Sequence, residues 1–189
     1  MAAQRRIPTL VTSRLVLRPP SPADLDDLTA LFGDPDAMHF VGNGKTFPAV
    51  QVAHMLESML SEARHGSVHP DWMPGVPGSL VMIELGTQKF VGMSVLRMLA
   101  PDLSAVIGDA PKPAIEAGYI LAKDFWGMGL ATEAAQALVK YGIELAGKEH
   151  IIAVADVKNT ASHHVLEKAG FGLVKEFDYR EMRMNYWVL

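Results

Sequence analysis

Two glycines in the second half of the chain could expose a row of backbone amides to an anion. The segment Trp126-Gly-Met-Gly-Leu-Ala-Thr-Glu-Ala134 follows an apolar stretch and opens a helical pattern. Because glycine has no side chain, the backbone at Gly127 and Gly129 can approach a ligand closely. The first turn of a helix also offers unpaired N–H donors and a positive dipole end. The turn therefore predicts a phosphate or pyrophosphate site, although alone it equally fits close packing of a strand and a helix.

A second polar group stands further along the chain. Asn159-Thr-Ala-Ser162 follows the apolar run 151–157 and begins another expected helix. Asparagine is a favoured N-cap residue, and a serine hydroxyl held in the first turn could serve as a proton donor. In the purely structural interpretation, Ser162 is only a first-turn residue of a capped helix.

A dinucleotide-binding fold is the main alternative for the glycine turn. It also has a strand, glycines, a helix and a second strand that ends in an acid, here Asp156. Its fingerprint, however, needs a small residue where Thr132 stands, and its glycines follow the strand directly, whereas residues 122–126 intervene here. A Walker-type loop is also not supported: Gly44-Lys-Thr46 occurs, but His39 stands where that pattern needs its first glycine. An NAD(P)-dependent oxidoreductase that uses Asp156 stays open as an alternative.

An alternation of strands and helices positions these groups. Apolar and polar residues alternate at 12–18 as in a strand, and Ser21-Pro22 is a typical helix start. Helical spacing returns at 49–64 and again from the glycine turn to Gly147. The other expected elements are a hairpin at 79–85 and 90–98, strands at 115–121, 151–157, 173–178 and 182–188, a helix from Asn159 to Gly170, and irregular connections at 66–78 and 100–113.

Composition narrows the class of protein. Apolar residues make up 49% and charged residues 20% of the 189 residues, which is ordinary for a single globular domain over 1–189. The net charge of −4 gives no reason to expect binding to nucleic acid or to an anionic membrane. The chain has no cysteine, which excludes disulfides and thiolate chemistry. Its start lacks the apolar run of a secretory signal, so we expect a cytoplasmic protein.

The two polar segments together resemble the GNAT superfamily of acyl-CoA-dependent N-acyltransferases. The likeness is greatest to the Rim-type branch, which includes ribosomal-protein N-terminal acetyltransferases. In that branch Trp-Gly-x-Gly-x-Ala-Thr-Glu-Ala and Asn-x-x-Ser-x-x-Val-Leu-Glu-Lys-x-Gly-Phe are hallmark segments, and 126–134 and 159–171 match them. The resemblance implies an α/β (α+β) single-domain fold. Its mixed, mostly antiparallel sheet would have splayed central strands and about four flanking helices.

The resemblance also implies acetyl-CoA as the co-substrate and assigns residues to it. Backbone amides of the glycine turn would hold the pyrophosphate, the end of the preceding strand would pair with the pantetheine arm, and Asn159 would contact that arm. The branch often has polar or basic side chains where Trp126 and Met128 stand, so side-chain help for the pyrophosphate is expected to be missing. The implied cofactor-binding residues are Tyr119, Ile120, Leu121, Met128, Gly129, Leu130, Ala131, Thr132 and Asn159.

The implied reaction is attack of a primary amine on the thioester in a ternary complex. Ser162 would protonate the leaving thiolate, and Glu116 is the first candidate for the base, with Glu176 and Asp178 as others. The acceptor, a protein N-terminus or a small amine, cannot be read from these motifs. A non-catalytic acyl-CoA sensor of the same fold stays open, and a homodimer through the open sheet edge is a further family-level expectation.

Metal chemistry is not expected. His65 and His69 are four residues apart, but Gly66 and Pro70 argue against the helix that would bring them together. Acidic residues on the acceptor side, such as Asp34, Asp36, Glu57 and Asp71, could attract a cationic amine.

Overall fold

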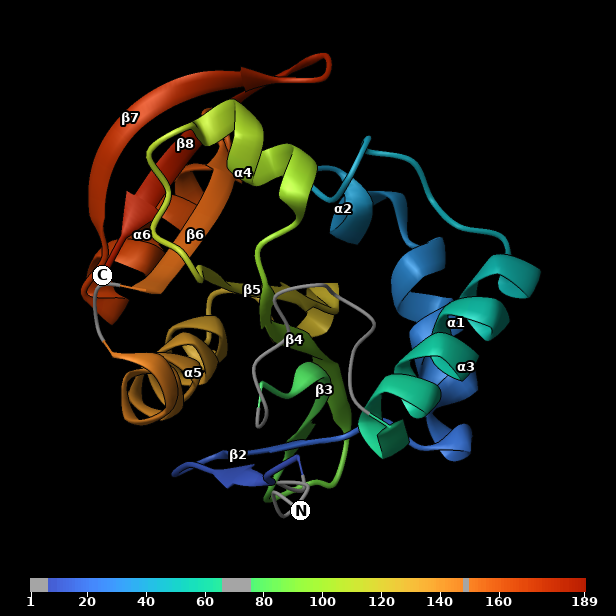
Figure 1. Ribbon diagram of the computed structural model, residues 1–189. Helices are drawn as coiled ribbons and strands as arrows, with labels where there is room; N and C mark the ends of the chain where they lie inside the picture. The colour runs from blue at the N-terminus through green and yellow to red at the C-terminus, as the bar shows by residue number, and fades with distance from the viewer. Residues whose placement is uncertain (1–6, 66–75, 148–149) are drawn as a thin grey trace.

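A computed structural model describes residues 7–65, 76–147 and 150–189. In these residues, helices pack on both faces of one eight-stranded sheet (Figure 1). Most of the connection expected at 66–78, with His69 and Asp71, lies outside these residues. The strands are β1 (Leu10–Val11), β2 (Leu15–Arg18), β3 (Gly78–Glu84), β4 (Phe90–Met98), β5 (Ile115–Leu121), β6 (Ile151–Asp156), β7 (Gly172–Tyr179) and β8 (Met182–Val188). The helices are η1 (Pro22–Asp24), α1 (Leu25–Gly33), α2 (Pro35–Met38), α3 (Ala49–His65), α4 (Pro101–Ile107), η2 (Lys123–Phe125), α5 (Leu130–Ala146) and α6 (Thr160–Ala169).

The sheet is mostly antiparallel and divides in its middle. Its strand order is β1-β2-β3-β4-β5-β6-β8-β7, and β5 with β6 is the one parallel pair among the described strands. Those two strands are paired only at Ile115 with Ile151 and at Glu116 with Ile152. From Ala117 onward β5 keeps its partner β4 but has no partner on the β6 side. The expectation of a mixed, mostly antiparallel sheet with splayed central strands is confirmed.

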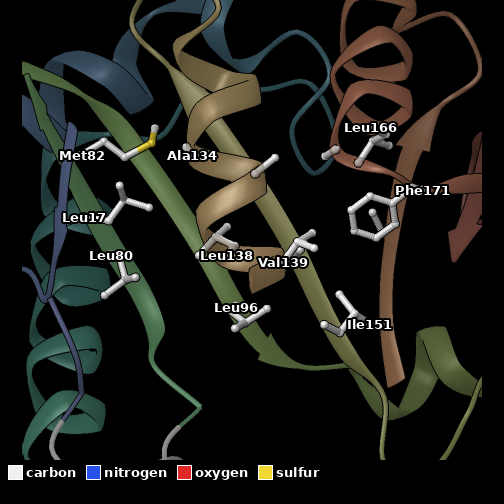
Figure 2. Packing of buried hydrophobic residues seen from close by; sticks show 14 of the residues in the cluster. Leu17, Leu80, Met82, Leu96, Ala134, Leu138, Val139, Ile151, Leu166 and Phe171 are labelled. Atoms are coloured by element: carbon white, nitrogen blue, oxygen red, sulfur yellow. The ribbon is translucent and has the colours of Figure 1, made fainter. Parts of the chain in front are cut away.

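Helices α5 and α6 cover one face of this sheet. Their apolar sides meet β2 to β6 in a core that contains Leu138, Leu166 and Phe171 (Figure 2). Ala134, which is fully buried, lets α5 approach the strands closely. This core places the first turns of both helices beside the open end of the β5–β6 gap.

The opposite face carries two separate helical groups. Helices α1, α2 and α3 bury Leu28, Phe32 and Val52 against β3, β4 and β5. Helix α4 buries Leu103 and Ile107 against the half of the sheet formed by β6, β7 and β8. These groups therefore cover different halves of the sheet, and the boundary between them lies at β5 and β6.

Two short helices are present in addition to the four expected long ones. The first, α2, starts at Pro35, and the Asp34 side chain caps it by accepting a hydrogen bond from the Asp36 amide at 2.9 Å. The second, α4, lies inside the connection 100–113, which was expected to be irregular, and it starts at Pro101. Proline suits the first position of a helix because its missing N–H needs no partner there. The described residues thus contain six α-helices.

Candidate active site

The gap between β5 and β6 forms the centre of the site. Tyr119, Ile120 and Leu121 lie on the part of β5 that has lost contact with β6, as expected for strand-like pairing with an extended ligand. The Trp126 indole donates a hydrogen bond to the Leu121 carbonyl at 2.8 Å. This bond ties the glycine turn to the end of β5, so the gap and the turn form one continuous surface.

The glycine turn leaves its amides open. Gly127 and Gly129 have φ of +73° and +76°, a backbone conformation that favours glycine. Gly129 is the N-cap of α5, and no side chain caps this helix. The amides of Leu130, Ala131 and Thr132 therefore belong to the first turn, where no intrahelical acceptor exists. The segment has the open donors and the dipole end that an anion site needs.

A basic side chain that sequence reasoning missed also reaches this turn. Arg14 donates through Nη1 to the Met128 carbonyl at 2.8 Å and through Nε to Glu133 Oε2 at 2.7 Å. Its Nη2 lies 3.6 Å from the position that a Cβ on Gly129 would occupy. The expectation of missing side-chain help considered only Trp126 and Met128, whereas the structure places the Arg14 guanidinium beside the turn. Only the fold brings Arg14 here, because 114 positions separate it from Met128.

Glu133 anchors this arrangement. Besides Arg14 Nε, it accepts hydrogen bonds from Thr12 Oγ1 at 2.5 Å, Ser13 Oγ at 2.9 Å and the Arg14 amide at 2.7 Å. Burial acts to raise the pKa of Glu133, but these hydrogen bonds outweigh it and lower the pKa to about 2. The carboxylate thus fixes the segment before β2 to the first turn of α5.

Replacing Glu133 with glutamine should lower thermal stability in a pH-dependent way. A hydrogen bond to a charged group contributes about 1.5–3 kcal/mol, which corresponds to a fall in Tm of roughly 3–10 °C at pH 7. Because the folded pKa lies below the ordinary value of 4.5, the stabilisation is complete above that value and is lost as the pH falls toward 2. Thermal melts from pH 7 to pH 3 should show the difference from wild type narrowing below pH 4.5. Glu144→Gln, at an exposed position of α5, is the control, and an undiminished difference at pH 3 would contradict this account.

Ser162 and Tyr119 meet at the edge of the gap. The Asn159 side chain caps α6 by accepting from the Ser162 amide at 3.1 Å, as the N-cap pattern predicted. The hydroxyls of Ser162 and Tyr119 are 2.9 Å apart, and Tyr119 also donates to the Ser162 carbonyl at 3.2 Å. Burial raises the pKa of Tyr119 to about 12, which the bond with Ser162 opposes only in part. At neutral pH the phenol stays protonated and can hydrogen-bond to the serine. Sequence reasoning considered only the Tyr119 backbone and missed this role.

The three candidate bases have different surroundings. Glu116 is buried at the last position where β5 pairs with β6, and its Oε2 lies 3.1 Å from Arg97 Nε on β4. Glu176 and Asp178 are exposed on the edge strand β7, where both form ion pairs with Arg183. Two strands separate β7 from β5, so only Glu116 adjoins the gap.

The dinucleotide alternative is wrong. That fold needs a largely parallel sheet, whereas this sheet is antiparallel except between β5 and β6. Asp156 Oδ1 accepts a hydrogen bond from the Lys158 amide at 2.7 Å, so this carboxylate serves the turn between β6 and α6.

Neither a cluster of metal-ligating side chains nor a membrane-spanning helix is present among the described residues. No three His, Cys, Asp or Glu side chains within 7–65, 76–147 and 150–189 are grouped so that they could hold a metal ion. Over the same residues, no helix has the length and apolar character needed to cross a membrane.

A hollow of about 670 Å³ adjoins the other side of the glycine turn. It lies between α1, the β3–β4 turn and η2, and it reaches Met128. Its lining includes none of Ser162, Tyr119 and Glu116, so it is separate from the gap.

Comparison with known proteins agrees with this arrangement. The family description "Acetyltransferase (GNAT) domain" matches residues 14–172. A Bacillus licheniformis protein described as uncharacterized N-acetyltransferase p20 is 26% identical over 179 residues, covering 93% of this chain and 90% of its own length. An Aspergillus fumigatus FsC-acetyl coenzyme A-N(2)-transacetylase is 29% identical over 177 residues, covering 90% of this chain and 67% of its own length.

Solved structures share the fold over nearly the whole chain. A GNAT-family acetyltransferase from Bacillus anthracis has a TM-score of 0.73 at 20% identity, covering 96% of this chain and 98% of its own. A RimL-type ribosomal-protein alpha-N-acetyltransferase in complex with coenzyme A has a TM-score of 0.65 at 17% identity, with 97% of both chains covered. The chain therefore belongs to the GNAT acetyltransferase family. More particularly, it is an acetyl-CoA-dependent N-acetyltransferase.

Proposed function

We propose that this protein, as one domain over residues 1–189, transfers an acetyl group directly from acetyl-CoA to a primary amine in a ternary complex. The observation that carries the proposal is the pair of hydroxyls, Ser162 and Tyr119, at the β5–β6 gap that continues into the glycine turn. The gap suits an extended thioester arm, the turn suits its pyrophosphate, and the hydroxyls suit its leaving group.

In this proposal the backbone holds most of the cofactor. Amides from Met128 to Thr132 bind the pyrophosphate, and Arg14 adds a positive charge beside them. The pantetheine arm runs along β5 beside Tyr119, Ile120 and Leu121, and pairs with the backbone groups that β6 leaves unpartnered. Asn159 contacts the arm through its amide nitrogen, because its Oδ1 is used by the Ser162 amide.

The chemistry requires two protons to leave the ammonium nitrogen and one to reach the sulfur. A free alkyl amine has a pKa of about 10.4, so it must lose its first proton, to solvent, before attack. In the proposal the neutral amine forms the C–N bond, and Glu116 then takes the second proton from the nitrogen through a water molecule. The C–S bond breaks, Ser162 donates its hydroxyl proton to the thiolate and regains one from solvent, and Tyr119 holds the serine hydroxyl in position.

A calorimetric titration with acetyl-CoA, with NADH in parallel, tests the binding half of the proposal. We expect saturable acetyl-CoA binding at micromolar strength and no heat from NADH. Gly129→Val should weaken acetyl-CoA binding at least tenfold, because a β-branched residue at φ of +76° forces the turn to rearrange. Absence of acetyl-CoA binding to wild type would overturn the proposal. Binding without acetylation of any amine would favour the sensor alternative.

The Rim-type affiliation, the homodimer and the cytoplasmic location stay predictions of the sequence. The 126–134 and 159–171 segments support the first of these. Sedimentation of the purified protein would test the second.

A further inference from the structure

An arginine and a glutamate lie side by side on the face of the sheet opposite α5 and α6. Arg97 on β4 is directly opposite Glu116 on β5, and Nε of the arginine lies 3.1 Å from Oε2 of the glutamate. β4 is an interior strand, yet the Arg97 side chain is 55% exposed. The exposure shows that neither α1–α3 nor α4 covers this part of the sheet.

The neighbouring positions are closely packed on one side and charged on the other. Gly118 follows on the same face of β5, and the Val95 side chain packs against it, 3.0 Å from where a Cβ would lie. Glu62 of α3 lies at the border, with its carboxylate 2.8 Å from where a Cβ on Gly78 would be. The negative charge of Glu116, followed by that of Glu62, raises the pKa of Arg97. The guanidinium is therefore a permanent cation paired with the Glu116 carboxylate.

This pair lies where the acetyl group of a bound cofactor should arrive. Glu116 is the last residue before the gap opens, five positions from Leu121 at the glycine turn. Five strand residues span roughly 16 Å, which suits an extended pantetheine arm running from a pyrophosphate at the turn. Helices α5 and α6 cover the other face, so within the described residues the acceptor would approach from the face that carries Arg97 and Glu116.

We propose that the acceptor is an α-amino acid, whose carboxylate binds to the free end of Arg97 and whose ammonium group binds to Glu116. The inference rests on the proposed function, since it identifies the substrate class of the same site.

The arrangement of donors supports a carboxylate ligand. Arg97 uses Nε for Glu116, and within the described residues no hydrogen bond occupies Nη1 or Nη2. Two parallel N–H donors at the end of a guanidinium match the two oxygens of a carboxylate. In a zwitterionic amino acid the carboxylate would face the Arg97 guanidinium, and the ammonium group would face the Glu116 carboxylate. A polyamine would bring only positive charge to Arg97, and a peptide N-terminus has an amide where the carboxylate should be.

Matched acceptor pairs test the proposal. Each of the twenty amino acids is offered beside its α-amide, and acetylation is followed by release of CoA. We expect kcat/KM for at least one free amino acid to be about 100-fold higher than for its α-amide. The amide lacks the carboxylate that the site would be built to bind. Arg97→Gln should reduce that ratio to about threefold or less, mainly through KM of the acid, and Arg97→Lys should retain part of it.

Controls separate this proposal from the proposed function. Arg183→Gln, which removes an exposed ion-paired arginine from the other face, should leave the ratio unchanged. Because Arg97→Gln leaves buried Glu116 unpaired, calorimetry with acetyl-CoA shows whether the variant is folded. Titration of the CoA complex with the amino acid then measures acceptor binding without turnover.

Acetylation of amides, peptides or polyamines with no preference for the acid, and no effect of Arg97→Gln, would overturn the amino-acid assignment alone. Failure to acetylate any amine would overturn the proposed function.

Discussion

Replacing Ser162 with alanine is expected to lower kcat about 100- to 1,000-fold while leaving the affinity for acetyl-CoA within about twofold of wild type. The proposed role of its hydroxyl is needed only when the C–S bond breaks, so its loss should affect the transition state rather than binding. The Asn159 cap uses the Ser162 amide and not its hydroxyl, so the start of α6 should persist in the variant. Steady-state kinetics and calorimetry measure the two effects separately.

The same helix offers a matched control for this prediction. Thr160→Ala removes another hydroxyl from the first turn of α6, at an exposed position, and should change kcat less than twofold. Tyr119→Phe should reduce kcat by a smaller factor than Ser162→Ala, about 10-fold, because it removes the partner of the serine and leaves the serine itself. A kcat for Ser162→Ala within threefold of wild type would show that the serine hydroxyl only completes a helix turn.

Much of the fold could be predicted because its signals are local. The strand expected at 115–121 is β5, as observed, and the hairpin strands lie within one residue of the predicted 79–85 and 90–98. Helix α4 was missed because it is short, with 7 residues between prolines and glycines that suggest a loop. Its Pro101 start and the spacing of Leu103 and Ile107 were signals that could have revealed it.

The site was less predictable because its decisive contacts join distant segments. The approach of Arg14 to the glycine turn depends on how β2 lies against α5, which no local pattern specifies. The pairing of Arg97 with Glu116 depends on the register of β4 against β5, because a shift by one residue would move a side chain to the other face. The contact of Tyr119 with Ser162 joins a strand to a helix 43 positions away. The motifs therefore predicted a cofactor side, while the proposed pair of hydroxyls and the proposed acceptor side needed the fold.

Gly92→Ala is expected to destabilise the protein by about 2–6 kcal/mol, the sum of the strain at a positive φ and the overpacking of a closed site. Gly92 has φ of +153°, and a Cβ there would lie 2.2 Å from the Ile120 carbonyl oxygen and 2.8 Å from the Leu121 Cα. Those backbone atoms cannot withdraw without breaking the pairing of β4 with β5 at Gly92 and Leu121. Since a domain has only about 5–15 kcal/mol of stability, chemical denaturation should show a much lower midpoint or an unfolded protein.

A second glycine of the same hairpin separates this steric argument from a general effect of glycine replacement. At Gly86, in the turn between β3 and β4, an added Cβ would meet nothing within 4 Å, and φ is not positive. Gly86→Ala should therefore change the free energy of unfolding by no more than about 0.5 kcal/mol. An equal loss of unfolding free energy in Gly92→Ala and Gly86→Ala would contradict the close approach of β4 to β5. If only Gly92→Ala is destabilised, any folded fraction should also bind acetyl-CoA more weakly, because Leu121 carries the carbonyl that anchors Trp126 and the glycine turn.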